Sequence, residues 1–148
     1  NLHVNLRMPH SRDRIPLMIG RSGENKTIPL ALRDLYHRNV IAGFDELPAK
    51  LDVVKARCDD IGRDPATLET SMLVTVMVDE NATADLIPKE MAQRMVVGSA
   101  EAIADQLKAK VLDAGVDAVI MNLPTSMQGY QPGHITALGE ALTPLVSD

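Results

Sequence analysis

Units that join a short apolar segment to an amphipathic helical segment constrain the fold of this chain most strongly. Such units are predicted over residues 14–33, 38–61 and 99–123. Repeats of strand and helix build parallel sheets and barrels. A closed barrel of this type needs about 250 residues, whereas the chain has 148. The sequence therefore predicts an α/β fold containing half of a TIM-type (β/α)8 barrel, which self-association would complete.

The spacing of apolar residues predicts where the individual elements lie. Strands are expected over residues 15–19, 36–41, 70–78 and 116–123, of which the first and the last are expected to be buried. Helices are expected from Thr27 to about residue 35, over 44–61, over 82–95 with a break near Pro88, from Ser99 to Gly115, and over 135–146. Residues 1–13 show no period and are predicted to be an arm or loop before a single domain over 14–148.

The predicted helix over residues 44–61 carries the clearest pattern. Its apolar residues recur at steps of three and four, which places them on one face of a helix. This stripe consists of Leu47, Leu51, Val54, Cys58 and Ile61. Gly62 is suited to end the helix because glycine readily adopts the left-handed conformation of a helix C-terminus.

Composition excludes several classes of partner. The net charge is −5, the basic residues are scattered and aromatic residues make up 2% of the chain, so nucleic acid and an anionic membrane are not expected partners. No apolar run reaches the roughly 20 residues of a membrane span. Cys58 is the one cysteine, so no disulfide forms within the chain and a cytoplasmic location is expected.

The loop after the first predicted strand is the first candidate site. Its residues are Gly20, Arg21, Ser22 and Gly23, followed closely by Lys26. Glycines allow a ligand to approach the backbone, and the polar side chains suit an anion. A tight turn with solvated charges explains the same residues equally well.

Asn122, at the end of the last predicted strand, is the second candidate. Ligands of parallel α/β folds collect at the carboxyl ends of strands. The alternative is a structural turn residue. His134, farther along, is expected to be a surface residue at the start of a helix.

Other polar residues give no firm assignment. His37, Arg38 and Asn39 interrupt a weak strand, so they belong either to a barrel mouth or to a surface loop. Cys58 lies on the apolar stripe and is expected in the core rather than as a nucleophile. No metal-ligand spacing and no catalytic motif is recognised, so no catalytic residue and no metal site is predicted.

A series of short segments resembles a known family. Residues 15–27 read IPLMIGRSGENKT, similar to the "P-x-M-I-G-G-S-G-E-K-x-T" strand and loop of luciferase-like monooxygenases. Residues 51–65 resemble the "KLDVL…HC…GRDP" helix and turn of the deazaflavin (coenzyme F-420)-dependent oxidoreductase subgroup. Residues 97–101, 114–124 and 138–145 resemble its "VGTPEE", "AGVDGFIFNLP" and "LLGEVLAPL" segments. The order matches the carboxy-terminal part of that family alone.

The resemblance implies an oxidoreductase or monooxygenase that transfers hydride between coenzyme F-420, or alternatively flavin mononucleotide (FMN), and a small-molecule substrate. It implies that the loop Gly20–Gly23 and Asn122 bind the cofactor at the barrel mouth. An isolated half barrel would be incomplete, and its open strand edges and uncovered apolar face predict a homo-oligomer.

Three departures from the family pattern support other functions. Arg21 replaces a glycine, Pro29 falls in the usual helix, and residues 35–39 replace the "ADAWN" strand, of which Asn39 alone remains. The last change predicts a rearranged sheet edge or a degenerating barrel. A non-catalytic remnant or assembly module, and a small-anion binding module that uses Arg21, Ser22 and Lys26, therefore remain alternatives.

Overall fold

The structure, a computed structural model, describes residues 18–20, 32, 36–82, 87–124, 129 and 131–146. The arm predicted over 1–13 and most of the helix predicted from Thr27 lie outside these residues. The strands are β1 (Met18–Gly20), β2 (His37–Val40), β3 (Glu69–Val78), β4 (Met95–Gly98) and β5 (Ala118–Asn122). The α-helices of four or more described residues are α2 (Leu47–Asp60), α3 (Lys89–Ala92), α4 (Ala100–Leu107) and α6 (Pro132–Val146).

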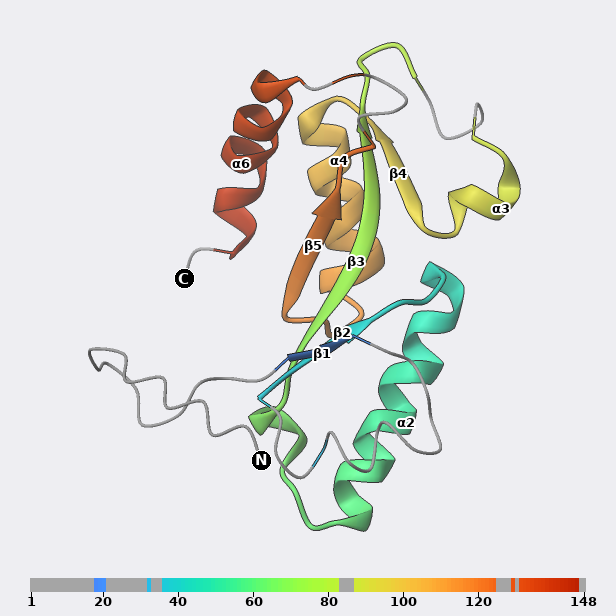
Figure 1. Ribbon diagram of the computed structural model, residues 1–148, viewed down its shortest axis with the longest axis vertical. Helices are drawn as coiled ribbons and strands as arrows, with labels where there is room; N and C mark the ends of the chain where they lie inside the picture. Colours follow the sequence, from blue (N-terminus) through green and yellow to red (C-terminus); the bar gives the residue numbers. More distant parts are fainter. Residues whose placement is uncertain are drawn as a thin grey trace, which may run out of the picture.

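The long strand β3 organises the sheet, and every pairing among the described strands is parallel. β5 pairs with residues 71–75 of β3, while β2 pairs with residues 69–72 and β4 with residues 75–78. Because the paired stretches of β3 overlap, β5 must lie along one edge of β3, with β2 and β4 one after the other along the opposite edge. β1 pairs with β2. By these registers β1, β2, β3 and β5 follow one another across the sheet, and β4 pairs with the later part of the β3 edge that β2 begins. In Figure 1, β5 and β4 lie on opposite sides of β3.

Helix α2 confirms the predicted amphipathic stripe. A short 3-10 turn, Phe44–Glu46, leads into it, and Pro48 lies in its first turn, where proline is tolerated. Four of the five stripe residues are buried, but Ile61 is 42% exposed because the helix has already ended at Asp60. Gly62 follows with φ of 66°, as expected for the residue that ends a helix.

Helices α4 and α6 cover the part of the sheet around β3 and β5, and α2 lies beside β2 (Figure 1). The hydroxyl of Ser99 accepts a hydrogen bond from the N–H of Ala102, which confirms the predicted cap of α4. A π-helical turn, Lys108–Leu112, extends α4 towards Gly115. Ile103, Leu107 and Leu138 are buried among the valines of β3 and form the main core.

Two predicted elements are wrong in extent. The helix expected over residues 82–95 is reduced, among the residues described, to the four residues of α3, which begins directly after Pro88. Met95 instead starts β4, a strand that the sequence analysis did not predict and whose residues are all buried. β5 is shorter than expected and is not fully buried, since Ile120 is 38% exposed. The first strand, β1, is not fully buried either, since Met18 is 56% exposed.

No helix among the residues described is long and apolar enough to cross a membrane.

Candidate functional site at the inner face of the sheet

The register of the strands divides their side chains between two faces. Successive strand residues point to opposite sides, and residues paired between parallel strands share a side. Met72, Val74 and Val76 of β3 are fully buried and belong to the core that includes the helices. The opposite side is here called the inner face, because helices surround the outside of a (β/α)8 barrel. By register it contains Met18; His37 and Asn39; Glu69, Ser71, Leu73, Thr75 and Met77; Met95 and Val97; and Ala118, Ile120 and Asn122.

A hydrogen-bonded network occupies the amino-terminal half of this face. Ser71 Oγ lies 2.7 Å from His37 Nε2 and accepts a hydrogen bond of 3.0 Å from Asn39 Nδ2. His37 Nδ1 lies 3.1 Å from Glu69 Oε2. Because Asn39 donates to Ser71, the serine proton is free to point at His37, whose other nitrogen then donates to Glu69. We call these four residues the Ser71 network.

The Ser71 network resembles a hydrolase triad in its order of serine, histidine and carboxylate. Its burial argues against that chemistry. Ser71 is 0% exposed, so no substrate reaches its hydroxyl, whereas the Glu69 side chain is 59% exposed. The network instead satisfies polar groups that the fold has buried, as interiors require. It joins β2 to β3 near the start of both strands.

This arrangement corrects the interpretation of residues 37–39. They form a strand, β2, which pairs with β1 on one side and β3 on the other. They are therefore neither a surface loop nor a sheet edge. Arg38 and Asn39 are 3% and 6% exposed, with Asn39 on the inner face and Arg38 on the helix side. The polar character of residues 37–39 suggested an exposed segment. A strand can nevertheless bury polar residues when neighbouring strands supply hydrogen-bonding partners.

The predicted site residues lie at the carboxyl ends of strands, as far as the structure describes them. Asn122 ends β5, is exposed, and pairs with Thr75 on the inner face. Gly20 ends β1 and pairs with Asn39. Arg21, Ser22 and Gly23 lie outside the described residues. Both residues lie at the carboxyl ends of their strands. β1 and β5 are separated in the sheet by β2 and β3, so the described residues do not bring Gly20 and Asn122 together.

Apolar side chains on the inner face are open to solvent next to Asn122. Leu73 is 36% exposed and Ile120, its partner across β3 and β5, is 38% exposed. Met18 on β1 is 56% exposed. On the opposite side of β3 and β5, Met72, Val74 and Val76 are buried and Val119 and Met121 are partly buried. The exposed apolar residues of these two strands therefore lie on the side that a barrel would enclose. The candidate site is thus one wall of a barrel interior. Its surface is apolar at Leu73 and Ile120, and the amide of Asn122 and the hydroxyl of Thr75 lie at the carboxyl end of the same strands.

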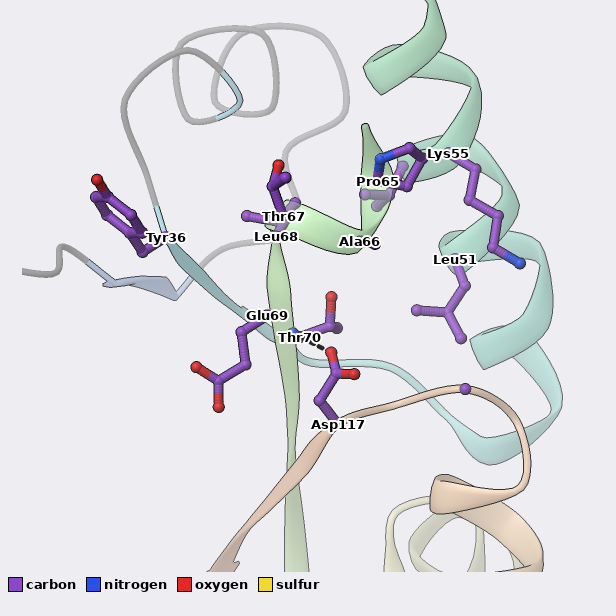
Figure 2. Close-up of a pocket in the computed structure, with 12 residues that line it drawn as sticks. Tyr36, Leu51, Lys55, Pro65, Ala66, Thr67, Leu68, Glu69, Thr70 and Asp117 are labelled. Atoms are coloured by element: carbon purple, nitrogen blue, oxygen red, sulfur yellow. Dashed lines mark hydrogen bonds between the residues drawn. The ribbon is translucent and has the colours of Figure 1, made fainter. Parts of the chain in front are cut away.

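Two hollows lie away from this wall. The first, of about 580 Å³, lies at the amino ends of β3 and β5, against α2 (Figure 2). Asp117 Oδ2 accepts a hydrogen bond of 2.7 Å there from the N–H of Thr70, drawn as a dashed line in Figure 2. Barrel enzymes bind their ligands at the opposite, carboxyl end. We therefore assign this hollow no part in the candidate site.

The second hollow, of about 660 Å³, lies beyond the carboxyl ends of β3 and β4, where Ser99, Glu101 and His134 line it. His134 is half-buried in the first turn of α6, close to its expected position. Asp79, Glu80 and Glu101 line the hollow, so the lining is acidic. Hydrogen bonds from its own backbone N–H and from Ser99 lower the pKa of Glu101. An acidic lining does not suit a phosphate group. Among the described residues no cluster of three or more metal-binding side chains occurs.

Comparisons with known proteins identify the fold. No protein-family model and no curated protein sequence matches the chain. Solved structures do match. An F-420-dependent secondary alcohol dehydrogenase, solved with an F-420–acetone adduct, superposes on 92% of the chain with a TM-score of 0.67 and 17% identity. The coenzyme F-420-dependent tetrahydromethanopterin reductase of Methanopyrus kandleri superposes on 90% with a TM-score of 0.67 and 12% identity. An EDTA monooxygenase from Chelativorans sp. BNC1 superposes on 86% with a TM-score of 0.64 and 10% identity.

The chain spans only 50%, 51% and 43% of these three structures. The fold is that of half a luciferase-like barrel. The luciferase-like fold and the half-barrel predicted from the sequence are thus confirmed.

Two parts of this half barrel were not predicted from the sequence. The Ser71 network was overlooked because its members are 32 and 34 positions apart, and Ser71 lies in an otherwise apolar strand. Thr75 between Val74 and Val76, on the same side of the strand as Ser71 and Glu69, was a usable signal, since polar residues that share one side of a strand indicate two unlike faces. β4 was missed because four residues are too few to show a period.

Proposed function

We propose that this chain forms one wall of the cofactor site of an oxidoreductase that binds coenzyme F-420 or FMN. The observation that carries the proposal is the position of Asn122 at the carboxyl end of β5, beside exposed apolar residues of the inner face. Two of the solved structures with the same half-barrel fold are named as F-420-dependent enzymes. Ligands of parallel barrels gather at this end.

The residues of the wall fit the chemistry of such a cofactor. A deazaflavin or flavin ring is a flat apolar system with polar atoms along its edge. Leu73 and Ile120 provide apolar contact area, while Asn122 and Thr75 provide donors and acceptors one pair of residues farther along β3 and β5. The loop Gly20–Gly23 would hold the phosphate-bearing chain of the cofactor, with Arg21 and Ser22 as anion ligands. The wall is half of the enclosure, because loops from both halves of a barrel form its mouth.

When bound, the cofactor would supply hydride transfer to or from a small organic substrate. The protein's own contribution is orientation and exclusion of water. Leu73 and Ile120 would keep water from one side of the ring, and the amide of Asn122 would fix the direction of its polar edge. The substrate stays a small molecule of unassigned identity, and the described residues supply one part of the site.

Titration of the purified chain with coenzyme F-420 and with FMN, followed by fluorescence, tests this function. Replacement of Asn122 by alanine removes a hydrogen bond worth about 1.4 kcal/mol, so we expect about tenfold weaker binding. Replacement of Gln93 by alanine is the matched control, because this amide lies just before β4, at the amino end of that strand, where it donates a hydrogen bond to Asp45. Equal weakening by both variants would contradict the assigned wall.

Absence of binding by folded wild-type chain would refute the proposal for both cofactors. That result would favour the alternative of a non-catalytic remnant or assembly module. The small-anion alternative has a separate test, in which inorganic phosphate is titrated into the chain and into a variant with both Arg21 and Lys26 replaced by alanine.

A further inference from the structure

We propose that Asn39 and Ser71 are positioning residues of the cofactor site. The hydrogen bond between their side chains holds Gly20 at the separation from Asn122 that the cofactor spans, and neither residue touches the cofactor itself. The inference rests on the function proposed above. It adds to that function two residues that act on the site from within the sheet.

One row of residues crosses the sheet from β1 to β5. The register pairs Gly20 with Asn39, Asn39 with Ser71, and Ser71 with Ala118. Glycine and alanine have no polar side chain, so the hydrogen bond of 3.0 Å from Asn39 Nδ2 to Ser71 Oγ is the polar side-chain contact within this row. It joins the strand that pairs with Gly20 to the strand that pairs with β5.

The position of β1 relative to β3 depends on β2. The three residues of β1 pair with His37, Arg38 and Asn39 of β2, and β2 pairs with the first part of β3. Asn39 and Ser71 are 6% and 0% exposed, so water competes little for their hydrogen bond. Loss of this bond would therefore let β2, and Gly20 with it, shift relative to β3.

Asn122 is placed by the other edge of β3, where it pairs with Thr75. It lies four positions beyond Ala118 on β5, or roughly 13 Å at about 3.3 Å per residue. Gly20 and Asn122 are also three strand spacings apart, or roughly 14 Å at about 4.8 Å each. One molecule can reach both only with two distant parts of itself.

FMN and F-420 are long molecules in which the ring and the phosphate lie apart. In the proposed function the ring contacts Asn122 and the phosphate-bearing chain lies at Gly20. Binding groups must be held to within about 0.5 Å to act together. A shift of Gly20 would therefore weaken the hold on the phosphate end and leave the ring end, which β3 and β5 carry, unchanged.

Comparison of FMN with riboflavin tests the inference, because riboflavin has the same ring and sugar chain but no phosphate. We expect wild-type protein to bind FMN more tightly. Asn39→Ala should reduce this preference about fivefold, the change in a binding constant that corresponds to one hydrogen bond, with little effect on riboflavin. Asn122→Ala should weaken both ligands alike. F-420 and its deazaflavin fragment without the phosphate give the same comparison.

Val54→Ala is the matched control for a loss of stability alone. Val54 of α2 is buried in a core cluster on the helix side, away from the inner face. Its truncation should lower the Tm but leave the preference for FMN over riboflavin unchanged. If Asn39→Ala fails to fold, Asn39→Leu, which has a similar size but no donor, replaces it.

The possible failures can be told apart. If Asn39→Ala changes the preference no more than Val54→Ala does, the inference is overturned and the proposed function stands. Equal binding of FMN and riboflavin by the wild-type protein also overturns it, because Gly20 would then not lie at the phosphate end. If the folded wild-type protein binds neither FMN nor F-420, the proposed function is refuted and the inference falls with it.

Discussion

Replacement of Ser71 by alanine should lower stability more than any other single change in the Ser71 network. The hydroxyl makes two hydrogen bonds, one with His37 and one with Asn39, and each is worth about 1 kcal/mol. The amide of Asn39 donates to the hydroxyl of Ser71 and would lose this acceptor. Because Asn39 is 6% exposed, water could replace the lost hydrogen bond only poorly. We therefore expect a loss of about 2–3 kcal/mol. For a chain of this length, about 2–4 °C per kcal/mol corresponds to a fall of about 5–10 °C in Tm.

Glu69→Gln provides the contrast within the same network. Its contact with His37 lies at an exposed rim, where an ion pair contributes about 0–1 kcal/mol. Thermal unfolding followed by circular dichroism would compare the two variants at one protein concentration, since dimerisation raises apparent stability. If Ser71→Ala unfolds within about 1 °C of Glu69→Gln, the buried end of the network does not stabilise the sheet and the reasoning is refuted.

Other changes have expected outcomes that the same instrument or a thiol reagent can check. Ser99→Ala removes the cap that binds the N–H of Ala102 and should cost about 1 kcal/mol in chemical denaturation. Gly62→Ala should destabilise the protein by a similar amount because the φ angle of Gly62 is 66°. Gly139→Ala, in the middle of α6 with open space around it, should instead stabilise the protein by about 0.5–1 kcal/mol. A change in the same direction for both variants would contradict the argument from backbone conformation. Burial raises the pKa of the Cys58 thiol, so at pH 8 it stays protonated and should react with iodoacetamide far more slowly in the native chain than in urea, with rapid native labelling as the contrary result.

Local pattern was sufficient wherever an element is defined by its own sequence. The stripe on α2 and the cap at Ser99 depend on residues within a few turns of each other, and both were predicted correctly. β3 was also predicted almost to the residue, because ten residues are enough to show strand character.

Pairing between distant segments decided the rest. β4 exists because residues 95–98 pair with β3, and His37 and Asn39 can be buried because β3 brings Ser71 beside them. Neither fact is contained in a short window. For the candidate site, the position of Asn122 at the end of β5 followed from the sequence, but the two-sided character of the sheet required the register.

The branched sheet also dictates when this chain can fold during its own synthesis. β3 receives β2 and β4 along one edge from segments that lie close by in the chain, but its other edge waits for β5, some 47 positions later. When β3 leaves the ribosome, that edge and the inner face have no partner from the nascent chain. At about 5–20 residues per second, the central strand stays half-paired for several seconds.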